Sequence, residues 1–311
     1  MTSSPDTQAL PAQRITGKAR LAGVLGWPVS HSRSPLLHNY WLRRYGVDGA
    51  YVPLPVRPGA FETAVRGLQA AGFRGANVTI PHKEAAFRLA DVLDESAQLT
   101  GSVNTLVFQD DGTIRGLSTD GDGFVASLRA AGVDLPDDLN PLGVRTPLDQ
   151  EMSLLGRRAL LLGAGGAARS VAVSLAAAGM QVCITNRTRA RADELAANVS
   201  GLSVCPWETW EDTLGDYALL VNTTSLGMEG GPEPGFCPAL ERASAGLVVA
   251  DIVYVPRITP LMAEAQRRGL RTVEGLGMLL HQARLGFQAW FGVEPQVDAQ
   301  TEAYVLASFS G

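Results

Sequence analysis

The sequence of 311 residues predicts an α/β fold with two domains, one of them a Rossmann-type nucleotide-binding domain. The length is sufficient for two hydrophobic cores. Short apolar runs alternate with helical stretches and with turns rich in Gly and Pro, which is typical of βαβ units. Residues 157–188 contain a complete strand, turn, helix and strand with a glycine-rich turn, and this segment predicts where a cofactor binds.

The turn in this segment is predicted to bind a pyrophosphate. The apolar run 159–162 ends at Gly163, as a buried parallel strand would. Gly163, Gly165 and Ala168 occupy the three small positions of the G-x-G-x-x-[G/A] pattern. There the first glycine permits the turn, the second lets the backbone approach phosphate, and the third small residue lets the helix pack on the strand. The helix N-terminus would supply N–H donors.

The tip of the next strand, 181–185, indicates which dinucleotide binds. NAD-binding units usually carry Asp or Glu there for the ribose hydroxyls, whereas this chain reads NRTRAR and has no carboxylate. A guanidinium suits a 2′-phosphate through paired, charged hydrogen bonds. We therefore predict NADP, with Arg187 and Arg191 on the 2′-phosphate and Arg189 in solvent.

Composition excludes several other classes. The net charge of −5 does not suggest a polyanion-binding surface, so no nucleic acid partner is expected. No apolar run is long enough to span a bilayer and residues 1–18 are polar, so a cytoplasmic location without membrane contact is expected. Cysteines and histidines lack metal-ligand spacing, which predicts reduced structural thiols and no metal site.

The first half of the chain predicts a second α/β unit after a loosely attached tail at 1–19. Strands are expected at 21–25, 51–56 and 75–79, and helices at 35–45 and 58–70. Ser34 before Pro35 reads as an N-cap, which leaves Ser32 without a structural role and makes both hydroxyls candidates for holding a small polar ligand. Open α/β sheets bind ligands at the carboxyl ends of their strands, which places Thr79 and Lys83 near a substrate. A solvated first-turn lysine is the structural alternative.

The remaining segments complete the two units. A hairpin is expected over 101–117, with its turn at 110–112, and the run 118–123 reads as a turn with Asp120 or Asp122 capping a helix. Residues 134–156 contain three prolines and read as a loop or linker insertion. Further strands are expected at 217–221, 247–252 and 270–273, and further helices at 259–268 and from 274 to about 291.

Nine short motifs between Gly26 and Trp290 follow one another in a specific order. They are SHSRSP, NVTIPHK, GSVNT, STDGDG, GAGGAAR, NRT, NTTSLGM, DIVY with TP beyond it, and GLGMLLHQA. In this order they closely resemble the shikimate dehydrogenase family. The resemblance implies a tail and substrate-binding domain at 1–119, an NADP-binding Rossmann domain at 120–274 and a C-terminal helical segment at 275–311 that returns to the first domain.

The resemblance also implies the functional residues, with an active site in the cleft between the domains. The substrate carboxylate would be held by Ser32 and Ser34. The residues implied to contact the substrate ring are Thr79, Lys83, Asn104, Asp120 and Gln282, with Tyr254 bordering the site. Those implied to bind the cofactor are Gly163, Ala164, Gly165, Gly166, Ala167 and Ala168 for the pyrophosphate, Asn186, Arg187, Thr188 and Arg191 for the adenosine phosphate, and Thr223, Met228, Gly275 and Met278 for the nicotinamide side.

The implied reaction is reversible hydride transfer between NADPH and the ketone of 3-dehydroshikimate, a step of aromatic amino acid (chorismate) biosynthesis. Negative charge develops on the carbonyl oxygen as hydride arrives, and an ammonium can both stabilise it and deliver a proton. Lys83 would be this acid, with Asp120 orienting it and a substrate hydroxyl. The charge of Asp120 would raise the lysine pKa and desolvation would lower it, and the sequence leaves the balance open.

Two alternatives remain at this point. A quinate or dual shikimate/quinate dehydrogenase, often NAD-dependent, is the nearer one, and the Ser32-x-Ser34 pair and the two arginines favour shikimate and NADP over it. A non-catalytic ligand sensor on the same fold is the other, and the presence of both Lys83 and Asp120 argues against it. The sequence allows a monomer or a homodimer.

Overall fold

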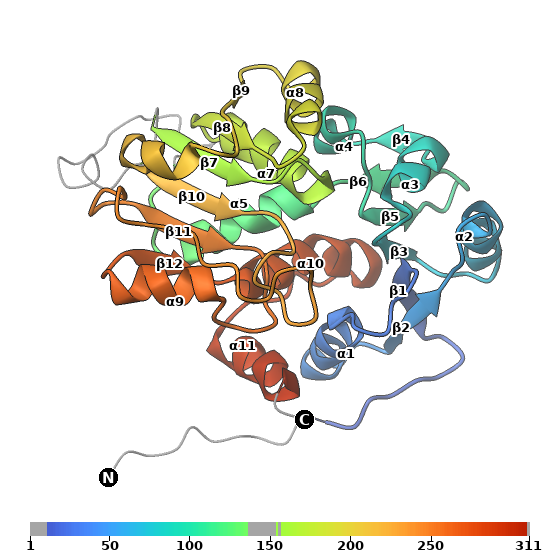
Figure 1. Ribbon diagram of the computed structural model, residues 1–311. Coiled ribbons are helices and arrows are strands. Elements are labelled where there is room, and N and C mark those ends of the chain that lie inside the picture. The colour runs from blue at the N-terminus through green and yellow to red at the C-terminus, as the bar shows by residue number, and fades with distance from the viewer. Residues whose placement is uncertain (1–10, 136–153, 155–156, 310–311) are drawn as a thin grey trace, which may run out of the picture. The chain divides into compact units, whose positions relative to one another are not determined.

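The computed structural model describes residues 11–135, 154 and 157–309 (Figure 1). Its contacts divide these residues into two compact units, each with its own sheet. The first unit comprises 11–93, 103–116 and 283–309, and the second comprises 94–102, 117–135, 154 and 157–282. The predicted α/β class is confirmed. The three domain boundaries drawn from the sequence remain a prediction.

The first unit has a six-stranded mixed sheet in the order β2-β1-β3-β5-β6-β4. Strand β1 pairs in parallel with β2 and β3, while β5 runs antiparallel to β3. The strands are β1 Arg20–Gly26, β2 Gly49–Pro55, β3 Gly75–Val78, β4 Val92–Leu93, β5 Thr105–Phe108 and β6 Ile114–Leu117, and the helices are α1 Ser34–Arg44, α2 Phe61–Ala70, α3 Lys83–Leu89, α11 Ala299–Leu306 and the 3₁₀ turn η2 Ala307–Phe309.

The second unit has a six-stranded, wholly parallel sheet in the order β12-β11-β10-β7-β8-β9, the arrangement of a Rossmann domain. Its strands are β7 Arg158–Leu162, β8 Gln181–Thr185, β9 Ser203–Val204, β10 Leu219–Asn222, β11 Val248–Asp251 and β12 Arg271–Val273. Its helices are α4 Glu95–Thr100, α5 Asp120–Ala130, α7 Gly166–Ala177, α8 Arg189–Asn198, η1 Trp210–Asp216 and α9 Pro260–Arg267. Helix α10, Gly275–Phe291, begins in this unit and ends in the first.

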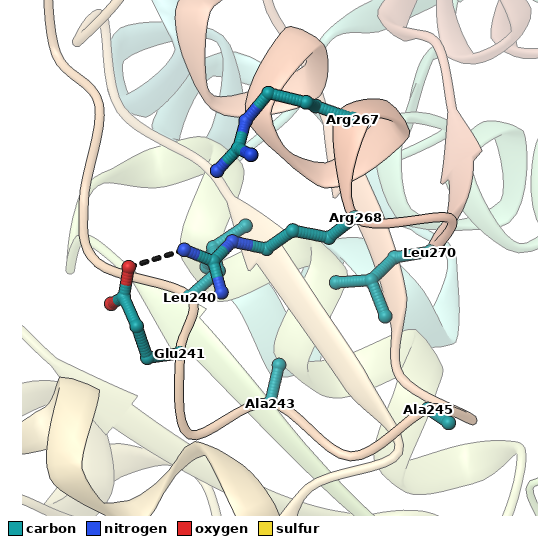
Figure 2. Close-up of a pocket in the computed structure, with 7 residues that line it drawn as sticks. All are labelled: Leu240, Glu241, Ala243, Ala245, Arg267, Arg268 and Leu270. Carbon is teal, nitrogen blue, oxygen red and sulfur yellow. Dashed lines mark hydrogen bonds and ion pairs between the residues drawn. The ribbon is translucent and has the colours of Figure 1, made fainter.

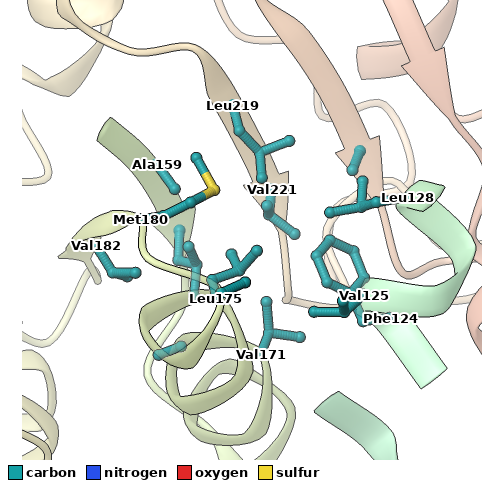
Figure 3. Packing of buried hydrophobic residues seen from close by; sticks show 14 of the residues in the cluster. Phe124, Val125, Leu128, Ala159, Val171, Leu175, Met180, Val182, Leu219 and Val221 are labelled. Atoms are coloured by element: carbon teal, nitrogen blue, oxygen red, sulfur yellow. The ribbon is translucent and has the colours of Figure 1, made fainter. Parts of the chain in front are cut away.

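Alternate residues of the central strands fill two cores in the second unit. On one face, Ala159 and Leu161 of β7 belong to a cluster with Val171 and Leu175 of α7 (Figure 3). On the other face, Leu160 and Leu162 belong to a cluster with residues of η1 and α9. Because both faces of a parallel sheet are covered, its strands read in sequence as short continuous apolar runs.

Aromatic rings form the centre of the first unit, around a histidine. The ring of His38 stacks on that of Tyr51 with centroids 4.0 Å apart and lies edge-on to Trp41 at 5.7 Å. Phe287 and Trp290 of α10 also contact it. Neither ring nitrogen of His38 has a hydrogen-bond partner, and complete burial lowers its pKa from 6.5 to about 3.

The structure corrects the predictions for two helix starts. Helix α1 begins at Ser34 itself, its N-cap position is Arg33, and the Ser34 N–H donates to the Oγ of Ser32 at 3.3 Å. Ser32 rather than Ser34 therefore supplies the acceptor at this end. Helix α5 begins at Asp120 after Thr119 and has no side-chain cap, so the predicted capping by Asp120 or Asp122 is wrong. Both carboxylates instead lie in the first turn, where the helix dipole favours negative charge.

The tail prediction is wrong for the residues just before β1. The Gln13 side chain donates to Asn39 Oδ1 at 2.9 Å and to the Gly49 carbonyl at 3.0 Å, and the Thr16 N–H donates to Asp48 at 3.0 Å. These bonds join the segment to the end of the sheet. Residues 1–10, and most of the predicted insertion at 134–156, lie outside the described residues.

Replacing His38 with Phe is expected to reduce the sensitivity of the protein to acid. Between the unfolded pKa of 6.5 and the folded value of about 3, the unfolded state binds the extra proton, so stability falls as pH falls. Acidification from pH 7 to pH 5 should cost about 2 kcal/mol through this group alone. The Tm measured at the two pH values should therefore differ less in His38→Phe than in the original protein.

The matched control for this measurement is His31→Phe, because His31 is exposed. This variant should lose as much Tm on acidification as the original protein. Equal losses in His38→Phe and the original protein would contradict the interpretation.

Candidate active site

Residues predicted to bind the substrate lie in the first unit at one edge of its sheet. Thr79 directly follows β3, and the loop after β1 leads to Ser32 and to Ser34 at the start of α1. Because β5 is antiparallel to β3, with Asn77 opposite Thr105, β5 begins at the edge where β3 ends. Asn104 therefore joins the serines and Thr79 at this edge.

Close backbone approaches hold these segments together. A side chain at Gly26 would place its Cβ 2.5 Å from Thr79 Cγ2, so only glycine allows the end of β1 to lie against Thr79. Lys83, the first residue of α3, is half-buried, and its carbonyl accepts a hydrogen bond from the Val103 N–H at 3.1 Å. This bond places the start of α3 beside the segment that carries Asn104.

The side chain of Asn104 is buried and oriented from within the sheet. Its Oδ1 accepts a hydrogen bond from the Thr105 hydroxyl at 3.2 Å, and its carbonyl accepts one from the Val78 N–H at 2.7 Å. A cavity of about 430 Å³ in the same unit is bordered by Ser32, Asn39 and Arg43, among other residues, but Ser34, Thr79, Lys83 and Asn104 do not line it. The strand ends and backbone contacts, and not this cavity, place Ser32, Ser34, Thr79, Lys83 and Asn104 at the same end of the sheet.

Asp120 and Gln282 form a second group, in the second unit. The Thr119 hydroxyl donates to Gln282 Oε1 at 3.4 Å, and Asp120 follows as the first residue of α5. A Cβ on Gly123 would lie 2.7 Å from the backbone nitrogen of Gln282, so α5 and α10 touch backbone to backbone at this point. The buried Gln282 is thus held beside the helix start that carries Asp120.

A buried carboxylate organises the loops after β10 and β11. Asp251 accepts hydrogen bonds from Asn222 Nδ2 at 3.0 Å, from the Thr259 hydroxyl at 2.8 Å and from the Val253 N–H at 2.9 Å. Burial raises its pKa to about 6, and these three bonds act in the opposite direction. The loops they join carry the predicted Thr223, Met228 and Tyr254, three site residues that are not adjacent in sequence.

The start of α10 approaches the same loops. A Cβ on Gly275 would lie 2.5 Å from the Val253 carbonyl oxygen, and Met278 packs against the core one turn further on. The predicted nicotinamide-side residues Gly275 and Met278 therefore lie close to the segment of Tyr254. Several residues here, Asp251 and Thr259 among them, carry structural roles that the motifs alone did not reveal.

The glycine-rich turn has the geometry that a pyrophosphate requires. Gly163 adopts φ +110°, and a Cβ there would lie 2.8 Å from Thr224 Cγ2. Around Gly165 and Gly166 the space is open within 4 Å, and α7 begins at Gly166. The turn thus leaves room beside its backbone, next to the N–H groups of a twelve-residue helix. These residues fit a dinucleotide.

The arginine-bearing segment after β8 contains a carboxylate partner that the sequence did not indicate. Arg187 Nη2 lies 2.6 Å from Glu233 Oε2, and the guanidinium lies over the Trp207 ring, 5.4 Å from its centroid. Hydrogen bonding to Glu233 raises the pKa of Arg187. Glu233 lies 46 residues away, so only the fold could reveal it. The Asn186 side chain donates to the Thr188 carbonyl at 2.8 Å and shapes the same turn.

The other two arginines of this segment differ in their contacts. Arg189 is exposed, as predicted, and it also forms a surface ion pair with Asp193, one turn along α8, at 2.8 Å. Arg191 is exposed on the same helix.

A second cavity, of about 460 Å³, has none of the predicted residues in its lining (Figure 2). Arg267 and Arg268 border it, and both pair with Glu264, while Arg268 also pairs with Glu241. Both arginines at this cavity therefore already form ion pairs with carboxylates. Among residues 11–135, 154 and 157–309, no group of His, Cys, Asp and Glu could hold a metal ion, and no helix is long and apolar enough to cross a membrane.

The parallel sheet of the second unit with its glycine turn, and the polar groups at one end of the first unit's sheet, define a dinucleotide-dependent dehydrogenase of two α/β units. Residues 24–106 match the family described as shikimate dehydrogenase substrate binding domain, residues 148–276 match shikimate / quinate 5-dehydrogenase, and residues 275–303 match shikimate 5′-dehydrogenase C-terminal domain. The chain belongs to the shikimate dehydrogenase family.

Individual relatives agree with this assignment. The chain is 51% identical over 294 residues to shikimate dehydrogenase (NADP(+)) of Gluconobacter oxydans, covering 94% of this chain and 98% of the relative. Shikimate 5-dehydrogenase of Thermus thermophilus, solved in complex with NADP(H) and shikimate, is 34% identical with a TM-score of 0.76 over 94% of this chain and 99% of that one. Quinate dehydrogenase of Corynebacterium glutamicum, solved with NAD, is 25% identical with a TM-score of 0.80 over 94% and 99%.

If Arg187 binds the 2′-phosphate as the sequence predicts, replacing it with Gln should raise the KM for NADP roughly tenfold or more, because the charged hydrogen bond would be lost. The KM for NAD, which lacks that phosphate, should change little. Steady-state kinetics with both cofactors measure this.

Arg189→Gln is the matched control, since Arg189 is an exposed arginine of the same segment that is predicted to lie in solvent and not on the phosphate. It should leave both constants near their original values. If Arg187→Gln leaves the KM for NADP unchanged, Arg187 does not bind the 2′-phosphate.

Proposed function

We propose that the chain catalyses the reversible, NADP-dependent reduction of 3-dehydroshikimate to shikimate, a step of the shikimate pathway. The observation that carries the proposal is the similarity to shikimate dehydrogenase (NADP(+)) of Gluconobacter oxydans, which is 51% identical over 94% of this chain. The polar groups at the site edge of the first unit's sheet support it. We also propose a cytoplasmic location, with shikimate, 3-dehydroshikimate and NADP as its small-molecule partners and a monomer or homodimer as its assembly.

The substrate is a cyclic hydroxy acid, and we assign its groups to residues by their chemistry. The hydroxyls of Ser32 and Ser34 would donate to the carboxylate. The residues proposed to contact the ring hydroxyls are Thr79, Lys83, Asn104, Asp120 and Gln282, with Tyr254 beside them. Amides and carboxylates discriminate hydroxyl groups well, because a buried polar group left unpaired is costly.

The cofactor would be held by the glycine turn and the arginine-bearing loop. Backbone N–H groups from Gly163 to Ala168 would bind the pyrophosphate. The adenosine phosphate would be bound by Asn186, Arg187, Thr188 and Arg191, and the nicotinamide side by Thr223, Met228, Gly275 and Met278. When bound, NADPH supplies the hydride. The chain itself excludes water from the reacting groups and orients them.

Lys83 is the proposed acid in the direction of reduction. Its ammonium would donate a proton to the substrate oxygen as that oxygen gains negative charge, and would take the proton back in the direction of oxidation. Asp120 would accept a hydrogen bond from a substrate hydroxyl and so fix the ring relative to the reacting carbon. Both residues lie at helix starts, where the backbone position is well defined.

Mixing the protein with shikimate and NADP⁺ should produce NADPH absorbance. Comparing kcat/KM for shikimate and quinate, each with NADP and NAD, should rank shikimate with NADP first. A preference for quinate with NAD would establish the alternative dehydrogenase. Absence of any turnover in a folded sample would favour a ligand sensor.

Lys83→Ala should lower kcat by roughly 10²-fold or more, the size expected for loss of a general acid. The dissociation constant for shikimate should change by only a modest factor, because other groups hold the substrate. Kinetics and equilibrium binding of shikimate together separate the two effects.

The other lysine of the chain, the exposed Lys18, gives the matched control Lys18→Ala, which should leave kcat unchanged. An unchanged kcat in Lys83→Ala would remove Lys83 from this role.

A further inference from the structure

A chain of buried hydrogen bonds crosses the sheet of the first unit beneath the proposed substrate groups. The Tyr51 hydroxyl of β2 reaches over β1 and donates to Asn77 Oδ1 of β3 at 2.6 Å. Asn77 Nδ2 donates to the Thr105 hydroxyl of β5 at 3.0 Å and to the Asn104 carbonyl at 3.3 Å. The Thr105 hydroxyl in turn donates to Asn104 Oδ1 at 3.2 Å.

The donors and acceptors along this chain run in one direction. Asn77 Nδ2 faces two acceptors, which fixes the orientation of that amide and points its oxygen at Tyr51. The Thr105 hydroxyl accepts from Asn77, so its own proton goes to Asn104. The Asn104 amide is therefore held with its oxygen towards Thr105, and its two ends are not interchangeable.

The other end of the chain is the Tyr51 hydroxyl, which is buried in the first unit. Burial raises the pKa of Tyr51 well above its ordinary value, so the hydroxyl keeps its proton and donates it to Asn77. Tyr51 thus supplies the donor that begins the chain, and Asn104, a proposed substrate-binding residue, lies at the far end.

We propose that Tyr51, Asn77 and Thr105 are positioning residues that hold the Asn104 amide in the geometry the substrate requires. The inference rests on the proposed function, which places Asn104 against the substrate. None of the three residues needs to touch the substrate itself. Their contribution is to remove the rotational freedom of the Asn104 amide.

The packing of the Tyr51 ring does not depend on its hydroxyl group. The ring is stacked on His38 at 4.0 Å and lies 5.9 Å from Trp290, and both contacts are independent of the hydroxyl. Removing the hydroxyl should therefore leave the ring in place. It would leave Asn77 Oδ1 without its buried donor and free the amide to rotate.

Tyr51→Phe is expected to raise the KM for shikimate roughly tenfold. The kcat should fall by no more than about threefold, because the reacting groups are untouched, and the KM for NADP should stay within about twofold. General loosening of the fold would instead move both KM values together. Thermal unfolding of each variant is measured alongside.

Tyr40→Phe is the matched control. Tyr40 lies on the same helix as Ser34, is equally buried, and has its hydroxyl near Arg44 at 3.4 Å instead of in the network. This variant should leave the KM for shikimate unchanged. A Tyr51→Phe enzyme with an unchanged KM for shikimate, or one in which both KM values rise equally, overturns the proposal.

A double-mutant cycle separates this proposal from the assignment of Asn104. If Tyr51 acts through Asn104, its effect on the KM for shikimate should largely disappear in a background that already carries Asn104→Ala. Full additivity overturns the proposal. If Asn104→Ala itself leaves the KM for shikimate unchanged, the proposed substrate contact of Asn104 fails instead.

Thr105 provides a second pair of variants in case Tyr51→Phe does not fold. Thr105→Val removes the hydroxyl with little change of shape and should raise the KM for shikimate, whereas Thr105→Ser retains the hydroxyl and should preserve most of the affinity. Equal KM values in the two variants overturn the proposal at this end of the network.

Discussion

The antiparallel pairing of β5 with β3 is the constraint on which the proposed substrate site depends. In a wholly parallel sheet, the start of each strand lies at the edge opposite the ends of its neighbours. By reversing direction, β5 brings its first residues to the edge where β3 ends, with Asn77 opposite Thr105. Asn104, which precedes β5, thereby comes to lie near Thr79, which follows β3.

In the second unit, a buried carboxylate and not a reversed strand holds the proposed site residues together. Its strands are all parallel, so the loops at their carboxyl ends lie at the same end of the sheet. A single desolvated carboxylate, Asp251, ties two of these loops together, since Asn222 directly precedes the loop after β10 and both Val253 and Thr259 belong to the loop after β11. Burial of an acid is unfavourable in itself, and three donors offset that cost.

Much of this organisation could be predicted from the sequence. The apolar runs located all the strands of more than two residues to within a few positions, and the glycine spacing located the nucleotide turn, because strand burial and positive φ angles leave local signatures. Helices α4, α8 and α11 were missed, since short or charged helices lack a distinct apolar period.

The features that the sequence did not predict are contacts between residues distant in sequence and the position of one helix start. The Glu233 partner of Arg187 and the attachment of Gln13 to Asn39 and Gly49 have no local signature. The reversed roles of Ser32 and Ser34 follow from a one-residue shift in the helix start, which propensity alone does not resolve. Side-chain networks such as Tyr51 to Asn104 likewise emerge only when strand register is known.

The presence of an amide in the middle of that network has a further consequence. Hydroxyl groups can pass a proton along a chain by exchanging covalent and hydrogen bonds, but the carboxamide of Asn77 neither gains nor loses one under ordinary conditions. The path from Tyr51 to Asn104 therefore cannot conduct protons. The network fixes the geometry of the side chains but does not move protons, so a change of protonation at Tyr51 does not alter the protonation of a group at Asn104.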